Sequence, residues 1–226
     1  MSSKLISSAI LFLFAFNSQS QVSLNLGSGV LKGFGVPKSF FGFHGGFELP
    51  RNNDVTFYVR MGYYLPRKED DVMMTNVTAT DLTASPYNLS VNYLTSTNYT
   101  TIEGGTRYYL GNDYDNGFSF YGGSNFMLFI NSVKRKYEKL DVSGQYTWEN
   151  DYELSPNEEV KGTILSLALG LQGGIKYTIP ARGTIYADIT GNYALFGKAS
   201  NTTAQNTALY APMIFIFNVG FRKDLY

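Results

Sequence analysis

The chain has 226 residues and no cysteine, which excludes disulfides and thiolate metal centres. It has a single histidine, His44, so a cluster of histidine ligands is excluded as well. Charged residues make up only 16% and cancel, with 18 Lys and Arg against 18 Asp and Glu, so the basic excess typical of nucleic-acid binding is absent. After the first twenty residues no apolar run approaches the length of a spanning helix. We therefore expect no cofactor, no metal site and no nucleic-acid partner.

The first twenty residues form a segment of their own. Lys4 supplies a positive charge, the residues from Ala9 to Phe16 form a short apolar core, and Ser18 and Ser20 are small residues at a cleavage position. A membrane anchor is the alternative, but the apolar stretch is short for a span. The sequence predicts a cleaved signal peptide over residues 1–20, export through the secretory pathway, and one mature domain over residues 21–226.

Aromatic residues and glycines are abundant, at 16% and 23 residues, and apolar residues alternate with small or polar ones. In Thr163–Tyr177 the odd positions are mostly leucine, whereas the even positions are Ser, Ala, Gly, Gln and Lys. Side chains alternate faces along a strand, so each such segment predicts a strand with one apolar face. The pattern recurs eight times, near Val22–Val30, Phe40–Leu49, Val55–Leu65, Thr97–Leu110, Phe118–Val133, Thr163–Tyr177, Thr184–Phe196 and Met213–Arg222.

The connections between these segments alternate in length. Pro50–Asp54, Gly111–Gly117 and Pro180–Gly183 are tight and rich in turn residues, whereas Arg67–Ser96 and Lys134–Val160 are long. An even strand number with short turns at one end and long loops at the other is the outer-membrane arrangement. The sequence predicts an all-β protein, an eight-stranded antiparallel up-and-down transmembrane β-barrel in a bacterial outer membrane, with both mature termini in the periplasm.

A soluble barrel such as a lipocalin also alternates, but with its apolar face inward. The polar face here is mostly Gly, Ser, Thr, Asn, Gln and Tyr rather than the Lys and Glu of a solvated surface. The apolar face carries no charge within the eight segments. We therefore expect lipid outside and a lumen filled by side chains that include Tyr58, Tyr121 and Tyr186.

The few charges on the polar face are expected to form a locking network inside the barrel, because buried charges must be paired. Hairpin geometry through the tight turns predicts four facing pairs: Lys176 with Asp188, His44 with Arg60, Glu103 with Asn125, and Arg107 with Tyr121. The predicted polar network of the lumen consists of His44, Glu48, Arg60, Glu103, Arg107, Lys176, Asp188 and Arg222.

Three segments carry a resemblance: Ser20-Gln21 at the end of the signal, the hairpin from Glu103–Gly111 into Phe118–Gly123, and the C-terminal strand Ile214–Arg222. Over Gln21–Tyr226 the chain resembles the small OmpA/OmpX-type outer-membrane barrels, especially those of Bacteroidetes-like bacteria. Barrels of this type usually end in an aromatic residue in phase with the lipid face. Tyr226 has the parity of Arg222, so the sequence predicts a strand that ends near Lys223 or contains a bulge.

Some barrels of this type are lipid-modifying enzymes or proteases, which need a His with a Ser, Asp or Glu near the outer rim. His44 lies in mid-strand on the polar face, so we expect no enzyme and no catalytic residue. Asp70 and Asp71 suggest a cation site but are more typical of a solvated rim. Lys134-Arg-Lys136 suggests contact with lipid phosphates, with a solvated rim as the alternative.

Three functions remain open. The favoured one is a structural or binding role through the long loops, in adhesion or in association with a surface ligand, a partner membrane protein or the envelope, with outer-membrane lipid around the barrel. A narrow pore and a lipid-modifying enzyme are the alternatives. Exposed Tyr and Trp favour interfaces. The candidate binding residues of the loops are Tyr87, Tyr93, Tyr146, Trp148 and Tyr152, with Tyr137 nearby.

Overall fold

The computed structural model describes residues 22–69, 73–79, 81, 83, 85–137, 146–147, 159–200 and 210–225. The predicted signal peptide and most of the predicted loop after Tyr137 lie outside these residues, as do Asp70, Asp71, Trp148 and Tyr152. The described chain consists of strands and their connections, and contains no helix able to span a membrane. The strands are β1 (Val22–Gly33), β2 (Ser39–Pro50), β3 (Val55–Lys68), β4 (Met73–Ala79), β5 (Asn88–Leu110), β6 (Gly117–Tyr137), β7 (Tyr146–Thr147), β8 (Glu159–Ile179), β9 (Gly183–Ala199) and β10 (Met213–Leu225).

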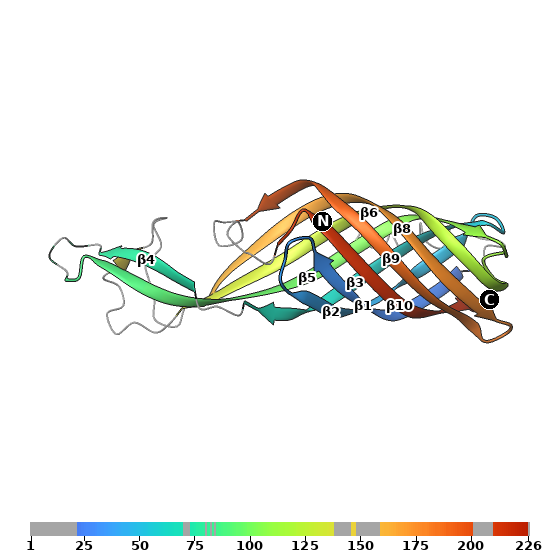
Figure 1. The fold of residues 1–226 in the computed structure, drawn as a ribbon, viewed down its shortest axis with the longest axis horizontal. Coiled ribbons are helices and arrows are strands. Elements are labelled where there is room, and N and C mark those ends of the chain that lie inside the picture. Colours follow the sequence, from blue (N-terminus) through green and yellow to red (C-terminus); the bar gives the residue numbers. More distant parts are fainter. Residues whose placement is uncertain are drawn as a thin grey trace, which may run out of the picture.

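Eight of these strands close into a barrel. Each pairs antiparallel with its neighbours in the order β3-β2-β1-β10-β9-β8-β6-β5, and pairing of β3 with β5 completes the ring. Figure 1 shows the strands crossing the barrel at a steep tilt, with the C-terminal end of β10 at one end of the ring. The predicted eight-stranded antiparallel up-and-down barrel is therefore confirmed. The ring leaves no unpaired sheet edge along its wall, which a membrane-embedded sheet requires.

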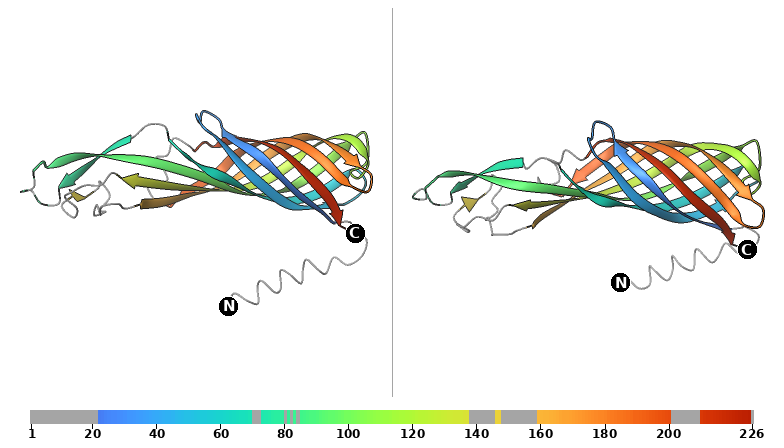
Figure 2. Two further views of the ribbon diagram at one scale, coloured as in Figure 1. Left: turned by 90° about the horizontal axis from the view of Figure 1, so that it is seen from below. Right: turned by 60° about the horizontal axis from the view of Figure 1, so that its bottom comes forward.

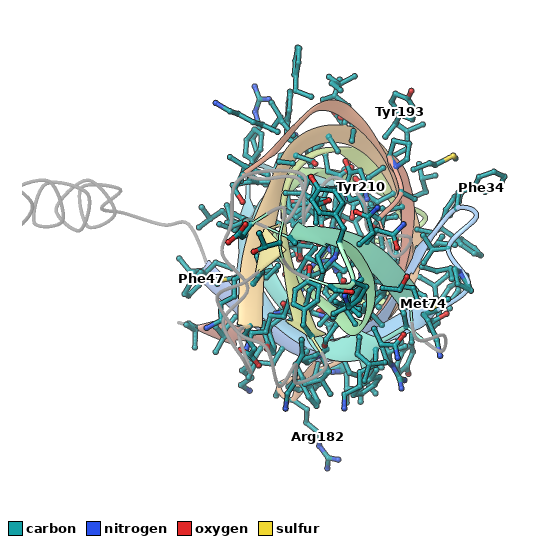
Figure 3. The ribbon with its side chains drawn as sticks, turned by 90° about the vertical axis from the view of Figure 1, so that its left-hand side faces the viewer. Phe34, Phe47, Met74, Arg182, Tyr193 and Tyr210 are labelled. Carbon is teal, nitrogen blue, oxygen red and sulfur yellow. The ribbon has the colours of Figure 1, made fainter. Side chains whose placement is uncertain are left out.

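The side chains of the ring alternate as expected from the sequence. The outward positions of β2, β3 and β8 are large apolar residues, for example Phe43, Val59 and Leu171, at 57%, 56% and 73% exposure. The inward positions are buried. In Figure 3, which views the barrel along its length, Tyr193 and Phe34 project away from the ring, whereas Tyr210 lies within it. A wall that is apolar on its outside and packed on its inside is that of a membrane barrel rather than a soluble one.

The four facing pairs predicted from the tight turns are wrong, each by two residues along one strand. His44 pairs with Gly62 and Arg60 with Gly46. Lys176 pairs with Tyr186, and Asp188 with Gly174. The cause is the position of each turn centre: the β8–β9 hairpin closes at Ile179 and Gly183, one residue earlier than expected.

The β5–β6 hairpin also differs by two residues, but its centre lies one residue later than expected. Glu103 pairs with Met127 rather than Asn125, and Tyr121 pairs with Tyr109 rather than Arg107. Because a slip of two residues preserves strand parity, every one of these side chains still points to the predicted face. The hydrophobic pattern therefore predicted whether each side chain points into or out of the barrel, but not which residue it pairs with on the neighbouring strand.

The C-terminal strand also differs from the expectation. β10 continues to Leu225, which pairs with Val22 of β1, and the pairing shows no bulge. Leu225 is exposed on the outward face, so the strand neither ends near Lys223 nor shifts its phase. The described part of β10 thus closes the barrel along the whole of β1.

The interior has two halves of different character. Toward the tight turns, which we call the turn end, it contains the charged side chains described below. Toward the opposite end, the loop end, it contains a continuous apolar cluster from seven strands and two connections. This outer layer comprises Leu31, Val36, Phe40, Tyr64, Tyr99, Met127, Phe129, Ala168, Ala211, Ile214 and Ile216.

The loop end also carries a structured extension. β5 runs 23 residues and β6 and β8 run 21 residues each, well beyond what a span needs. β4 pairs with the first part of β5, and β7 pairs with the end of β4. The predicted long loop from Arg67 to Ser96 is therefore mostly a β-hairpin that projects past the barrel rim (Figures 1 and 2).

Candidate functional site

The turn end of the lumen holds three carboxylates and three guanidinium groups. The acids are Glu48, Glu103 and Asp188, and the bases are Arg60, Arg107 and Arg222, all buried. They come from β2, β3, β5, β9 and β10, so the network ties together distant parts of the ring. Equal numbers of both signs make this buried cluster formally neutral, which removes the large cost of an isolated buried charge.

Arg60 lies between two acids. Its Nη2 is 2.8 Å from Oε2 of Glu103, and its Nη1 is 3.0 Å from Oδ2 of Asp188. Asp188 also accepts hydrogen bonds from the Asn218 amide at 2.8 Å and from the Tyr121 hydroxyl at 3.1 Å. Several donors on each carboxylate are what makes a buried ion pair tolerable.

Arg107 forms the other bridge. Its Nη1 is 2.8 Å from Oε2 of Glu48 and its Nη2 is 3.2 Å from Oδ2 of Asp188. Nη1 of Arg222 lies 3.5 Å from Oε1 of Glu48. Glu48 accepts further hydrogen bonds, including one from the Thr56 hydroxyl at 2.6 Å. The six charged groups therefore form one connected cluster rather than separate pairs.

Tyrosines fill the space around the guanidinium groups. The Arg107 guanidinium lies 4.3 Å from the ring centroid of Tyr58 and 5.0 Å from that of Tyr121. Two glycines make room for the rings on the crowded wall: a Cβ on Gly174 would lie 2.6 Å from Cζ of Tyr121, and one on Gly220 would lie 2.5 Å from the Tyr186 hydroxyl. Glycine at these two positions therefore leaves the space that the inward rings of Tyr121 and Tyr186 occupy.

His44 lies at the edge of this cluster. In the β2–β3 pairing it lies opposite Gly62 rather than opposite Arg60. Its Nε2 is 2.8 Å from the hydroxyl of Tyr186. Its Nδ1 is buried and has no hydrogen-bond partner among the described residues. No acid contacts the ring, and no group of three His, Asp or Glu side chains in the described chain could hold a metal ion. This geometry is that of a packed core histidine.

Lys176 lies apart from Asp188, and its side chain binds the connection between β5 and β6 at the turn end. Its Nζ donates to the carbonyl oxygens of Asp113, Asn116 and Gly117, at 2.6, 2.5 and 3.3 Å. The side chain therefore caps the β5–β6 turn. Arg222 contacts the same turn, since its Nη2 donates to the carbonyl of Tyr114 at 2.5 Å. The Arg222 guanidinium also lies 4.4 Å from the ring centroid of Tyr114, and burial raises the pKa of this phenol.

The structure thus brings seven of the eight predicted lumen residues into or beside one cluster and places Lys176 at the turn. Sequence reasoning missed the polar partners Asn218 and Thr56, and it missed the outer layer altogether. The outer layer includes an edge-to-face contact between Phe40 and Tyr99, with ring centroids 4.9 Å apart. Together the two layers fill the lumen with side chains, as an eight-stranded ring allows.

The extension has its own small core. Val77, Val91 and Tyr93 are buried in it, and the rings of Tyr93 and Tyr137 lie 5.5 Å apart. Of the candidate binding residues, Tyr87 is exposed and Tyr93 is buried. Tyr146 lies in β7, and its side chain is outside the described residues, as are Trp148 and Tyr152.

The outer surface of the extension carries apolar side chains. Met74 is 72% exposed, and Leu94 is exposed on the same face of the hairpin, whereas Tyr87 is exposed opposite Ala79 at the far end of β4. Because these side chains lie beyond the barrel rim, they are not covered by the hydrocarbon that surrounds the barrel wall. An ordered, apolar surface outside the membrane is typical of an interaction site.

No known family model matches the chain, and neither does any curated protein sequence. Solved structures with a similar fold include Neisserial surface protein A, at 15% identity and a TM-score of 0.49, covering 92% of this chain and 98% of that one. A major outer membrane protein from Thermus thermophilus has 11% identity and a TM-score of 0.47, covering 92% and 100%. The attachment invasion locus protein Ail of Yersinia pestis, in complex with the heparin analogue sucrose octasulfate, has 14% identity and a TM-score of 0.44, covering 90% and 97%.

The strand order and the side-chain pattern of this chain define its class by themselves. Eight antiparallel strands close into a ring, the outward face is apolar, and the inward face is packed and neutral in charge. The fold is therefore that of a membrane-spanning eight-stranded β-barrel, the architecture of the small outer-membrane barrels.

Proposed function

We propose that this protein is a closed outer-membrane scaffold that binds a surface partner through its extension. In this arrangement the signal peptide over residues 1–20 is removed, the turn end and both mature termini face the periplasm, and the extension faces outward. The observation that carries the proposal is the ordered hairpin of β4 and β5, which has a core of its own beyond the barrel rim.

The filled lumen supports a scaffold over a pore. The charged cluster closes the turn end and the apolar outer layer closes the loop end, so a solute would have to displace both. The hydrogen bond of His44 to the Tyr186 hydroxyl, deep in the packed lumen, supports a scaffold over an enzyme. A steady conductance of porin size in planar bilayers, or a change in lipid A mass produced by the purified protein, would favour one of these alternatives.

The exposed apolar residues of the extension support the binding role. Met74, Tyr87 and Leu94 present side chains to water on a rigid two-stranded support, and rigid aromatic and apolar side chains make efficient contacts with a partner. The partner is a surface ligand, a neighbouring cell or another membrane protein. Tyr146 lies in β7, which pairs with β4 of the extension, and it is part of this proposal together with Trp148 and Tyr152, which follow it in the sequence.

The test is to shorten the extension and measure folding and binding separately. In one variant residues 70–93 are replaced by a short turn; in a second, Met74, Tyr87 and Leu94 are changed to Ser on the intact hairpin. Partners are captured from native outer membrane by cross-linking to the wild-type protein. Both variants should keep the mobility difference between unheated and boiled samples on a detergent gel, and both should lose a partner that the wild type retains.

A matched control changes three lipid-facing residues that the extension does not include, Phe43, Val59 and Leu171, to Ala. This control should keep the partner. Retention of every captured partner by both extension variants would contradict the proposal.

A further inference from the structure

The outer wall of the barrel carries an open groove of about 750 Å³. It lies across β6, β8, β9 and β10, which are neighbours in the sheet (Figure 1). The sides of the groove include the outward residues Phe126 and Phe215, and its floor includes Ser124, Gly173 and Gly191. The residues that line the groove carry no charge. The groove is therefore an apolar depression in the wall that faces lipid.

One leucine protrudes from the floor of this groove. Leu171 is exposed to 73%, the largest exposed fraction of any large apolar side chain in the described residues. The cause is its surroundings, because Leu171 pairs with Ser124 of β6 and with Gly191 of β9, and both have too small a side chain to pack against it. Gly173 follows two residues later on the same face of β8. The wall therefore presents a knob, Leu171, beside a hollow over Ser124, Gly173 and Gly191.

Packing inside the barrel does not account for the glycine at position 173. A Cβ on the inward Gly170 would lie 2.1 Å from Oδ1 of Asn192, so the packed lumen requires glycine there. A Cβ on the outward Gly173 would lie 4.0 Å from the nearest atom, the carbonyl oxygen of Tyr121, and a larger residue would fit. Glycine in a strand often marks a place where another chain approaches closely, and small residues permit such an approach between protein segments in membranes.

A protein side chain fills the hollow at a lower cost than lipid does. Lipid tails are as apolar as leucine, so van der Waals fit and the ordering of lipid decide between the two occupants. An acyl chain held in a short hollow beside a protruding side chain loses the freedom of many bonds, whereas a leucine side chain has few rotamers to lose. A protein contact also releases the acyl chains that it displaces from the wall. These arguments favour a membrane-embedded protein as the occupant.

The knob and the hollow lie on one surface, so the surface is complementary to itself. In a two-fold contact each copy presents the same patch to the other. Two copies in one membrane are related by an axis along the membrane normal, which keeps every residue at its own depth. Because the strands are tilted by about 35–45°, one small neighbour of Leu171 lies nearer the loop end, whereas Gly173 lies nearer the turn end on the same side. The hollow between them is thus at the depth of Leu171, where the knob of a second copy can enter it.

We propose that two copies of this protein associate side by side in the membrane through this wall, with Leu171 of each copy in the hollow over Gly173 of the other. The uncharged patch brings no like charges together. The contact is separate from the extension, so it does not depend on the proposed function. A second copy captured by cross-linking has the mass of the protein itself, and it is thereby told apart from a partner of the extension.

The test measures energy transfer between labelled copies of the protein in phosphatidylcholine vesicles of increasing lipid content. The chain has no cysteine, so Arg182→Cys in the exposed β8–β9 turn supplies a single labelling site (Figure 3). Leu171→Ala removes the knob, and Gly173→Leu fills the hollow. The matched controls Leu49→Ala and Gly45→Leu make the same changes on β2, on the opposite side of the ring. Each variant must first show the mobility difference between unheated and boiled samples on a detergent gel.

The wild type and both controls should transfer energy above the level of random proximity. Leu171→Ala and Gly173→Leu should each raise the dissociation constant by about tenfold or more, because each dimer loses the packing of two leucine side chains. A mixture of these two variants should associate more strongly than either variant alone. In the mixed pair the intact knob of the Gly173→Leu copy enters the intact hollow of the Leu171→Ala copy, and the shortened side chain faces the filled hollow. A defect within one barrel would not be repaired by mixing.

Energy transfer at the random level in the wild type would overturn the proposal, and so would a mixture that associates no more strongly than its components. Two measurements test the other occupants. A lipid that native mass spectrometry finds on a monomeric wild type and not on Gly173→Leu would make the hollow a lipid site. In native outer membrane, Ile189→Cys at the groove should give a bis-maleimide product of twice the mass of the protein, whereas Val59→Cys on β3 should not. Products only with a chain of another mass would assign the wall to a different membrane protein and contradict the proposal.

Discussion

The two halves of the lumen are both filled by side chains, but with charged groups in one half and apolar groups in the other. The turn end is filled by six charged groups that depend on each other for neutrality, whereas the outer layer is filled by aliphatic and aromatic side chains such as Phe129 and Ile214. An apolar layer loses only the contacts of a residue that is removed. A charged cluster also leaves the remaining charges buried without partners, so its members are more interdependent.

The sharpest way to test this comparison is to remove the acid at the centre of the cluster. Asp188→Ala leaves Arg60 and Arg107 each without one carboxylate. We expect a loss of about 3–5 kcal/mol in the free energy of unfolding, because an uncompensated buried charge remains. Urea titration of the barrel in lipid vesicles, followed by tryptophan fluorescence, measures it. Asp54→Ala in an exposed turn is the control, and equal curves for both variants would show that the cluster is not interdependent.

Substitutions in the outer layer should lower the free energy of unfolding less than Asp188→Ala does, and by an amount that follows the side-chain volume removed. Ile214→Ala removes part of a buried side chain from this layer, and we expect a loss of about 3 kcal/mol in the same titration. Met127→Leu conserves the volume and should cost less than about 1.5 kcal/mol. A Met127→Leu barrel as weakened as the Asp188→Ala barrel would mean that the two halves do not differ as described.

The smallest effect concerns the coupling of Lys176 to Asp188. Lys176→Met should cost about 2 kcal/mol, because charged hydrogen bonds to three turn carbonyls are lost. Since Lys176 serves the turn and Asp188 the cluster, the double variant with Asp188→Ala should show an interaction energy below about 0.5 kcal/mol. A double-mutant cycle in vesicles measures this energy. An interaction energy of about 2 kcal/mol would instead support the direct pair that the sequence predicted.

The sequence predicted the barrel because alternation is visible wherever inward residues are small or polar. It could not predict the outer layer, because there both faces are apolar: Met213-Ile-Phe-Ile-Phe217 is apolar at every position, so the inward Ile214 and Ile216 are not distinguished. It could not predict the partner of Asp188, because the turn centre depends on backbone hydrogen bonds that residue types alone leave open. The extension was missed because its apolar stripe is short: Leu89, Val91 and Tyr93 alternate with Ser90 and Asn92 inside a segment that is otherwise rich in Asn and Thr.

The charged cluster also constrains the order in which the barrel can be assembled. Its ion pairs join residues far apart in the chain: Arg60 and Asp188 are separated by 128 positions. Arg222 and Asn218 lie on the last strand, and they complete the contacts of Glu48 and Asp188. An incomplete sheet therefore keeps unmatched charges on the face that will become its interior. Closure by β10 supplies the last of these contacts, to Glu48 and Asp188, so we expect the cluster to be complete only when the final strand has joined the sheet.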